Sequence, residues 1–213
     1  MAKPIDWLRN RADEVAGTAT HLRLVRGPGR TEHSLLPIPK KARFGSGRCV
    51  VSPEGAVEFL GVETIRLRSA SDRYLATTSG PGSGSTTVSI ACHATSARYP
   101  AVDIDESYEL RVTKQKVTVD APEEAGVIRA LQTLRQMHDT VDGVTSVPVV
   151  RIEDEPRLAW RGLMIDVVRH WIPMENLFAI VDAMESVKLN VLHLHLTDNQ
   201  AFRVQSKVHD RIH

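Results

Sequence analysis

The feature that most constrains this chain is a strand–helix–strand pattern in its final quarter. Residues 162–168 form a short apolar run that contains one acid, which is typical of a parallel strand covered on both faces. Pro173 then opens a predicted helix, because proline at the first helical position sacrifices no hydrogen bond. Apolar residues follow at steps of three and four: Leu177, Ile180, Val181, Met184 and Val187. With a second strand at 191–196, the pattern predicts a right-handed βαβ unit with parallel strands.

The end of this helix carries its own signals. We expect Lys188 in the last turn, where a positive charge complements the helix dipole. Asn190 is then expected as the cap in the left-handed conformation that often ends a helix.

Polar residues follow the ends of both predicted strands. Around the first end lie Asp166, Arg169 and His170, and around the second lie His195, Asp198 and Asn199. In open α/β sheets and in (β/α)8 barrels alike, the carboxyl edge of the strands carries the chemistry. The pattern therefore predicts part of an active-site rim.

The amino-acid sequence of this segment resembles that of a known family. Residues 161–173 read RGLMIDVVRHWIP, residues 188–198 read KLNVLHLHLTD and residues 200–203 read QAFR. Together with Met184, they resemble the opening of the catalytic barrel of glycoside hydrolase family 20, the β-N-acetylhexosaminidases. The resemblance covers most of residues 156–206 and fixes residue types at many spaced positions.

The resemblance implies a substrate-binding role for Arg169 and Asp198, which would hold ring hydroxyls of a terminal N-acetylhexosamine. A planar guanidinium offers a fork of donors and a carboxylate offers acceptors, so the two can grip neighbouring hydroxyls. The alternative is that these side chains only pair with each other. The chain departs from the family pattern at Asn199, usually an aspartate, and at Phe202, usually a tryptophan.

The resemblance also implies an adjacent Asp-Glu pair at the end of a later barrel strand. There the aspartate orients the substrate's acetamido group, which is the nucleophile, and the glutamate protonates the leaving oxygen. The Asp-Glu dipeptides of this chain, at 13–14, 105–106 and 154–155, precede the predicted barrel, so we expect solvated charges. We therefore assign no catalytic residue and expect a truncated, inactive fragment of an exo-β-N-acetylhexosaminidase.

Two alternatives remain open. The chain could be a non-catalytic sugar-binding or degenerate hexosaminidase-like protein. Less expected is a metal-dependent hydrolase using His193 and His195, since alternate strand residues point to one side. A metal site needs three or four converging ligands and the sequence offers no further cluster, so we expect neither a metal nor a cofactor.

The middle of the chain has a different pattern of predicted secondary structure. Short β-type runs occur at 50–51, 57–60, 64–68, 87–91, 108–113 and 116–119, the last two joined by a tight turn at Lys114-Gln115. A helix follows, with Pro122 in its first turn and a predicted buried face of Val127, Ala130, Leu131, Leu134 and Met137. Strands followed by a helix predict a small α+β domain. Residues 36–39, 105–110 and 125–134 resemble the accessory domain that precedes the family's barrel.

These readings give three parts. We expect an N-terminal extension of unknown role at 1–33, which includes one amphipathic helix over 4–16. An α+β accessory domain is expected at 34–155, and the truncated start of a (β/α)8 TIM barrel at 156–213.

Composition limits the remaining possibilities. A formal net charge of +1 with scattered basic residues predicts neither a nucleic-acid partner nor a membrane partner. There is no export signal and no apolar run of about eighteen residues, so we expect a cytoplasmic protein with Cys49 and Cys92 as free thiols. The sequence leaves the oligomeric state open.

Overall fold

The computed structural model describes residues 35–80, 86–97, 99, 101, 103–209 and 211. The expected extension at 1–33, its helix over 4–16 and the Asp-Glu pair at 13–14 lie outside the described residues.

The central part of the chain forms a seven-stranded mixed sheet. Its order is β1-β7-β4-β5-β3-β2, with β6 paired to β7. The strands are β1 (Lys41–Val50), β2 (Val57–Gly61), β3 (Thr87–Ala94), β4 (Tyr108–Val112), β5 (Lys116–Glu123), β6 (Asp139–Val141) and β7 (Val144–Asp154). The β2–β3 and β3–β5 pairs are parallel and the other pairs are antiparallel. The predicted hairpin between β4 and β5 is present, with Val112 opposite Val117.

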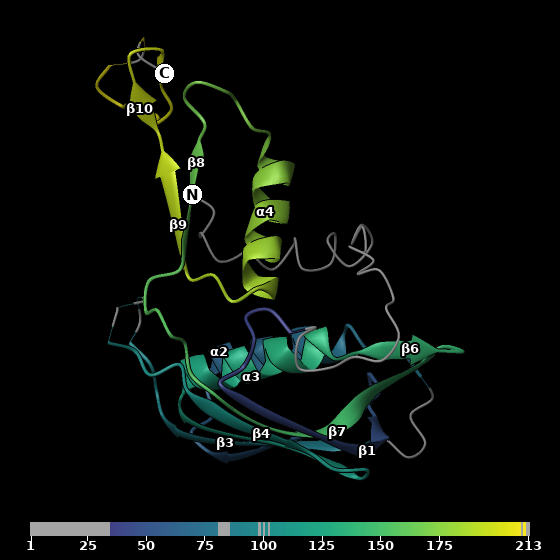
Figure 1. The fold of residues 1–213 in the computed structure, drawn as a ribbon. Coiled ribbons are helices and arrows are strands. Elements are labelled where there is room, and N and C mark those ends of the chain that lie inside the picture. Colours follow the sequence, from purple (N-terminus) through teal and green to yellow (C-terminus); the bar gives the residue numbers. More distant parts are fainter. Residues whose placement is uncertain are drawn as a thin grey trace. The chain divides into compact units, whose positions relative to one another are not determined.

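One face of this sheet packs against two helices, α2 (Ile65–Leu75) and α3 (Glu124–Gln136), as Figure 1 shows. In β4 the residues alternate between buried and exposed, so that Tyr108, Leu110 and Val112 enter the core. The predicted face of α3 is buried as a whole: Val127, Ala130, Leu131, Leu134 and Met137. The α+β prediction for this part is confirmed.

The expected strand at 64–68 is wrong, because α2 begins there. Thr64 caps the helix by accepting a hydrogen bond from the Leu67 amide. The local alternation of Ile65 and Leu67 resembled a strand, but the buried residues of the whole segment, Leu67, Ala70, Ser71 and Tyr74, follow helical spacing.

The start of α3 also differs from the expectation. Pro122 lies in β5 and the helix begins only at Glu124. The first turn of α3 lies close to the preceding chain, since a Cβ added to Gly126 would lie 2.1 Å from the Ser107 carbonyl oxygen. Glycine at this position therefore allows α3 to approach the chain before β4.

The last part of the chain contains the predicted βαβ unit. Strand β8 (Gly162–Asp166) pairs in parallel with β9 (Val191–His195), and α4 (Met174–Ser186) connects them. The sequence predicts Pro173 at the first helical position, but it is the N-cap of α4, and the helix begins one residue later, at Met174. Strands β10 (Thr197–Asp198) and β11 (Ala201–Phe202) then form a short hairpin (Figure 1).

The end of α4 departs from the prediction. Lys188, and not Asn190, adopts the left-handed conformation, with φ of 61°. Its side chain is buried and donates to Asp154 at 3.0 Å and to the Tyr108 hydroxyl at 2.9 Å. These tertiary contacts explain why a lysine occupies a backbone conformation that usually favours glycine or asparagine.

Candidate functional site

The two residues predicted to bind substrate meet at the carboxyl edge of the β8–β9 pair. Arg169 follows β8, and its Nη1 donates to Oδ2 of Asp198, which ends β10. Their side chains are 50% and 27% exposed, so the pair lies at the surface and remains accessible. The structure thus brings both residues together, as consecutive parallel strands allow.

Asp166 supports Arg169 from the end of β8. Its Oδ1 accepts from the amides of Val168 at 2.9 Å and Arg169 at 3.1 Å, and its Oδ2 accepts from Nε of Arg169. Desolvation would raise the pKa of Asp166, but the two amides and the guanidinium outweigh it and hold the pKa below its usual value.

His195 and Asn199 complete the surroundings of Asp198. The Asn199 amide donates to Oδ1 at 2.7 Å, and Nε2 of His195 lies 3.0 Å from Oδ2. The amide hydrogen bond, followed by the His195 contact and the charge of Arg169, lowers the pKa of Asp198. Asp198 is therefore an ionised hydrogen-bond acceptor at neutral pH.

Not every polar residue predicted for the rim joins this cluster. His170 is exposed, and Asn199 contacts Asp198 through its backbone amide. His193 is exposed, whereas His195 faces Asp198. Over the described ranges, no three His, Cys, Asp or Glu side chains are grouped as metal ligands.

Arg203, which follows β11, is a rim residue to which the sequence pattern assigned no role. Its Nε donates to the Val167 carbonyl at 3.1 Å and its Nη2 to the Val168 carbonyl at 3.3 Å. Its guanidinium also lies over the Trp171 ring, 5.4 Å from the centroid. Its place in the QAFR segment was the signal available in the sequence.

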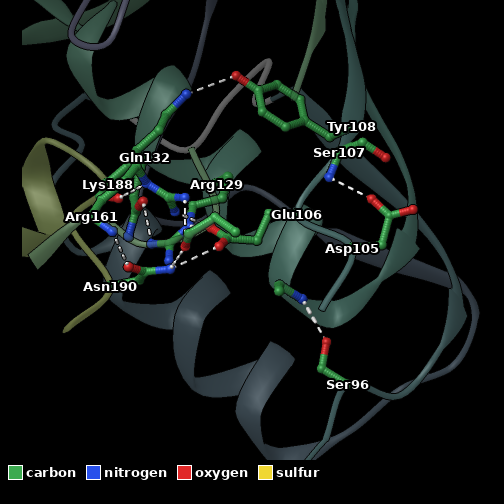
Figure 2. Close-up of polar contacts among 12 residues, drawn as sticks. Ser96, Asp105, Glu106, Ser107, Tyr108, Arg129, Gln132, Arg161, Lys188 and Asn190 are labelled. Atoms are coloured by element: carbon green, nitrogen blue, oxygen red, sulfur yellow. Dashed lines mark hydrogen bonds and ion pairs between the residues drawn. The ribbon is translucent and has the colours of Figure 1, made fainter. Parts of the chain in front are cut away.

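A second polar cluster lies at the other ends of β8 and β9. Glu106 is 7% exposed and accepts from Arg129 of α3, from Arg161 just before β8, and from Asn190 just before β9. Figure 2 shows these side chains converging on the Glu106 carboxylate. The expectation that the 105–106 pair is solvated is therefore wrong for Glu106, because two guanidiniums offset the desolvation cost of burying its carboxylate.

The pair at 154–155 is also not simply solvated. Asp154 accepts from the Tyr108 hydroxyl at 2.8 Å and from Lys188 at 3.0 Å, while Glu155 pairs with the exposed Lys40. Burial lowers the pKa of Lys188, although Asp154 opposes that shift. A cavity of about 210 Å³ lies beside these charges, away from the Arg169–Asp198 pair.

In the part of the chain that the structure describes, no helix has the length and apolar character needed to span a membrane.

Comparison with known proteins extends these observations. Residues 32–155 match the family described as "Glycosyl hydrolase family 20, domain 2", and residues 158–213 match the family described as "Glycosyl hydrolase family 20, catalytic domain". The beta-N-acetylhexosaminidase of Cellulomonas fimi is 52% identical over 101 residues, which cover 47% of this chain and 20% of that protein.

Solved structures show the same fold. Flavobacterium johnsoniae chitobiase matches 86% of this chain and 30% of its own, at 27% identity and a TM-score of 0.74. An exo beta-N-acetylglucosaminidase of Vibrio harveyi, solved with N-acetylglucosamine, matches 88% of this chain and 29% of its own. Its identity is 22% and its TM-score is 0.70. This chain thus spans less than a third of the lengths of these three relatives.

The family's domain 2 alone accounts for more than half of the residues, and the βαβ unit that follows matches the start of its catalytic domain. This chain belongs to glycoside hydrolase family 20 and contains its accessory domain and part of its catalytic domain.

Proposed function

We propose that the rim of the β8–β9 pair binds the terminal N-acetylhexosamine of an oligosaccharide or glycoconjugate. The observation that carries this proposal is the Arg169–Asp198 pair, whose members come from two consecutive segments and remain partly exposed. Family membership supports it, because β-hexosaminidases are among the relatives of this chain.

The chemistry of the pair fits vicinal hydroxyls. Nη1 and Nε of Arg169 are engaged by Asp198 and Asp166, whereas its Nη2 makes no hydrogen bond to any described residue. A sugar hydroxyl can accept from Nη2 and donate to the ionised carboxylate of Asp198. A site built in this way discriminates against sugars that lack the hydroxyl.

For the whole protein we propose exo-acting hydrolysis of terminal N-acetylglucosamine or N-acetylgalactosamine with retention of configuration. In this scheme the substrate's acetamido oxygen is the nucleophile. The described Asp-Glu dipeptides, at 105–106 and 154–155, belong to the accessory part and make structural contacts there. The role proposed for residues 156–213 by themselves is therefore binding of the sugar and not its cleavage.

A non-catalytic sugar-binding protein is the second candidate. It is favoured by the same absence of an Asp-Glu pair beside the rim among the described residues. Both candidates require Arg169 and Asp198 to hold the sugar, and they differ in hydrolysis.

The proposal is tested by titrating methyl N-acetyl-β-glucosaminide into the 213-residue chain and following its NMR signals. Arg169→Lys should weaken binding about tenfold or more, because a point charge cannot replace the guanidinium fork. Asp198→Asn should weaken it similarly. Arg43→Lys, an exposed replacement on β1, is the matched control and should bind like the wild type. Equal affinity of the wild type and Arg169→Lys would reject the sugar-holding role.

A further inference from the structure

The turn that presents Arg169 is held from both sides by side chains. We infer that Asp166 and Arg203 are positioning residues for the sugar site, fixing the backbone of residues 167–169 and the direction of the Arg169 guanidinium. This inference rests on the proposed sugar-binding function and adds two residues that need not touch the sugar.

Asp166 holds the amide side of the turn. One carboxylate oxygen accepts the amides of Val168 and Arg169, and the other accepts Nε of Arg169. A single carboxylate thus fixes both the backbone and the side chain of Arg169. Hydrogen bonds between an ionised carboxylate and these donors are stronger than neutral ones, which favours one orientation of the guanidinium.

Arg203 holds the carbonyl side of the same turn. Its Nε and Nη2 donate to the carbonyls of Val167 and Val168 at 3.1 and 3.3 Å, and Trp171 lies beneath its guanidinium. The Val167 and Val168 side chains are buried, so the turn is also anchored by packing against the interior. A lysine at this position has no fixed pair of donors to reach two successive carbonyls.

The consequence lies in the geometry of Arg169. With Nε bound to Asp166 and Nη1 bound to Asp198, the plane of the guanidinium is determined, and Nη2 is the nitrogen that keeps both of its N–H groups for a ligand. Loss of Asp166, or of the turn geometry that Arg203 holds, lets the Arg169 guanidinium change direction. Binding of the sugar must then order the guanidinium, which reduces the net binding free energy.

Two variants and two controls test this inference in the full 213-residue chain. Asp166→Asn and Arg203→Lys should each weaken binding of methyl N-acetyl-β-glucosaminide about five- to tenfold. Asp142→Asn makes the same atom change in an exposed turn where asparagine tolerates the positive φ of 50°. Arg43→Lys is the control for the arginine change, and both controls should bind like the wild type.

Further readouts separate positioning from general stability. Amide hydrogen exchange at Val168 and Arg169 should be slow in the wild type and faster in Asp166→Ala, with an unchanged unfolding midpoint. Asp166→Glu retains the charge but is one methylene longer, so it should bind the sugar more weakly than the wild type. A pure charge effect would leave the affinity at the wild-type level.

The outcomes distinguish this inference from the proposed function. If Arg169→Lys loses affinity while Asp166→Asn and Arg203→Lys bind like the wild type, the positioning roles are refuted and the sugar site stands. If the wild type does not bind the sugar, the proposed function fails. Fast exchange of the Val168 and Arg169 amides in the wild type would then overturn the positioning inference independently.

Discussion

At the scale of single residues, the burial of Glu106 is the most consequential feature of the accessory part. Glu106 is 7% exposed, and its carboxylate joins Arg129 with Arg161 and Asn190, which lie just before β8 and β9. One side chain thus connects the accessory sheet to the start of both β8 and β9. Removing a buried charge from such a cluster leaves its partners unpaired.

Glu106→Gln should therefore lower the free energy of unfolding by about 3–5 kcal/mol, because two largely buried guanidiniums lose their counter-charge. Urea denaturation measures the change. Glu109→Gln on β4, whose side chain is exposed and pairs only loosely with Arg151, is the matched control and should cost less than about 1 kcal/mol. Similar losses in both variants would show that the buried cluster contributes little.

The same residue predicts a pH dependence of stability. Burial would raise the pKa of Glu106, but Arg129 and Arg161 outweigh burial and lower it below 4.5, its ordinary value. The unfolded chain then binds the proton more readily, so the stabilisation is complete above that value and is lost as the pH falls through the folded pKa. Urea unfolding between neutral pH and pH 3 should show a shallower acid loss in Glu106→Gln than in the wild type. Parallel curves would contradict this assignment.

At the scale of elements, the close approach of α3 to its sheet depends on Gly126. Glycine inside a helix normally costs about 1 kcal/mol relative to alanine. Here an added Cβ would lie 2.1 Å from the Ser107 carbonyl oxygen and 3.0 Å from the Ala121 Cβ, so the helix would have to move. Packing therefore outweighs helix propensity at this position.

Gly126→Ala should destabilise the chain by about 1–3 kcal/mol, the usual cost of overpacking a core. Thermal unfolding measures it, with Ser69→Ala on the exposed face of α2 as the reference for helix propensity alone. That control should be neutral or slightly stabilising. A gain of stability in Gly126→Ala would mean that α3 can shift without cost.

At the scale of the whole molecule, the described β8–β9 pair leaves apolar side chains uncovered. Met164 of β8 is 56% exposed, and among the described residues no third strand pairs with β8 or β9. Open strand edges beside apolar surface favour association with other chains.

The 213-residue chain should accordingly self-associate at micromolar concentration, as measured by sedimentation velocity. Met164→Lys should reduce the association without lowering the unfolding midpoint, because the site is already exposed. Ile65→Lys, on an equally apolar residue that is 79% exposed in α2, is the control and should not reduce it. An equal effect of both changes would place the contact elsewhere.

The chain by itself should not hydrolyse 4-nitrophenyl N-acetyl-β-glucosaminide. The family resemblance expects the acid catalyst in an Asp-Glu pair at the end of a later barrel strand, and no such pair lies beside the described rim. The Cellulomonas fimi relative, assayed under the same conditions, is the positive control. Turnover above background would refute the assignment of the chain as a sugar-binding part without its acid.

The sequence determined the features that depend on local periodicity and residue chemistry. The βαβ unit, the buried face of α3 and the meeting of Arg169 with Asp198 followed from apolar spacing and from the rule that parallel strands end at one edge. Where two local patterns competed, as at 64–68, the longer helical period prevailed over a short alternation.

Only the tertiary structure decided which charges are buried. Glu106 and Lys188 are buried and Asp154 is partly buried, although all three occupy stretches that look solvated in sequence. Their positions depend on partners 23 to 84 residues away. A left-handed lysine and a carboxylate between two guanidiniums are favourable only when those partners converge. Local sequence carries no record of that convergence, because the stabilising free energy lies in contacts formed across the fold.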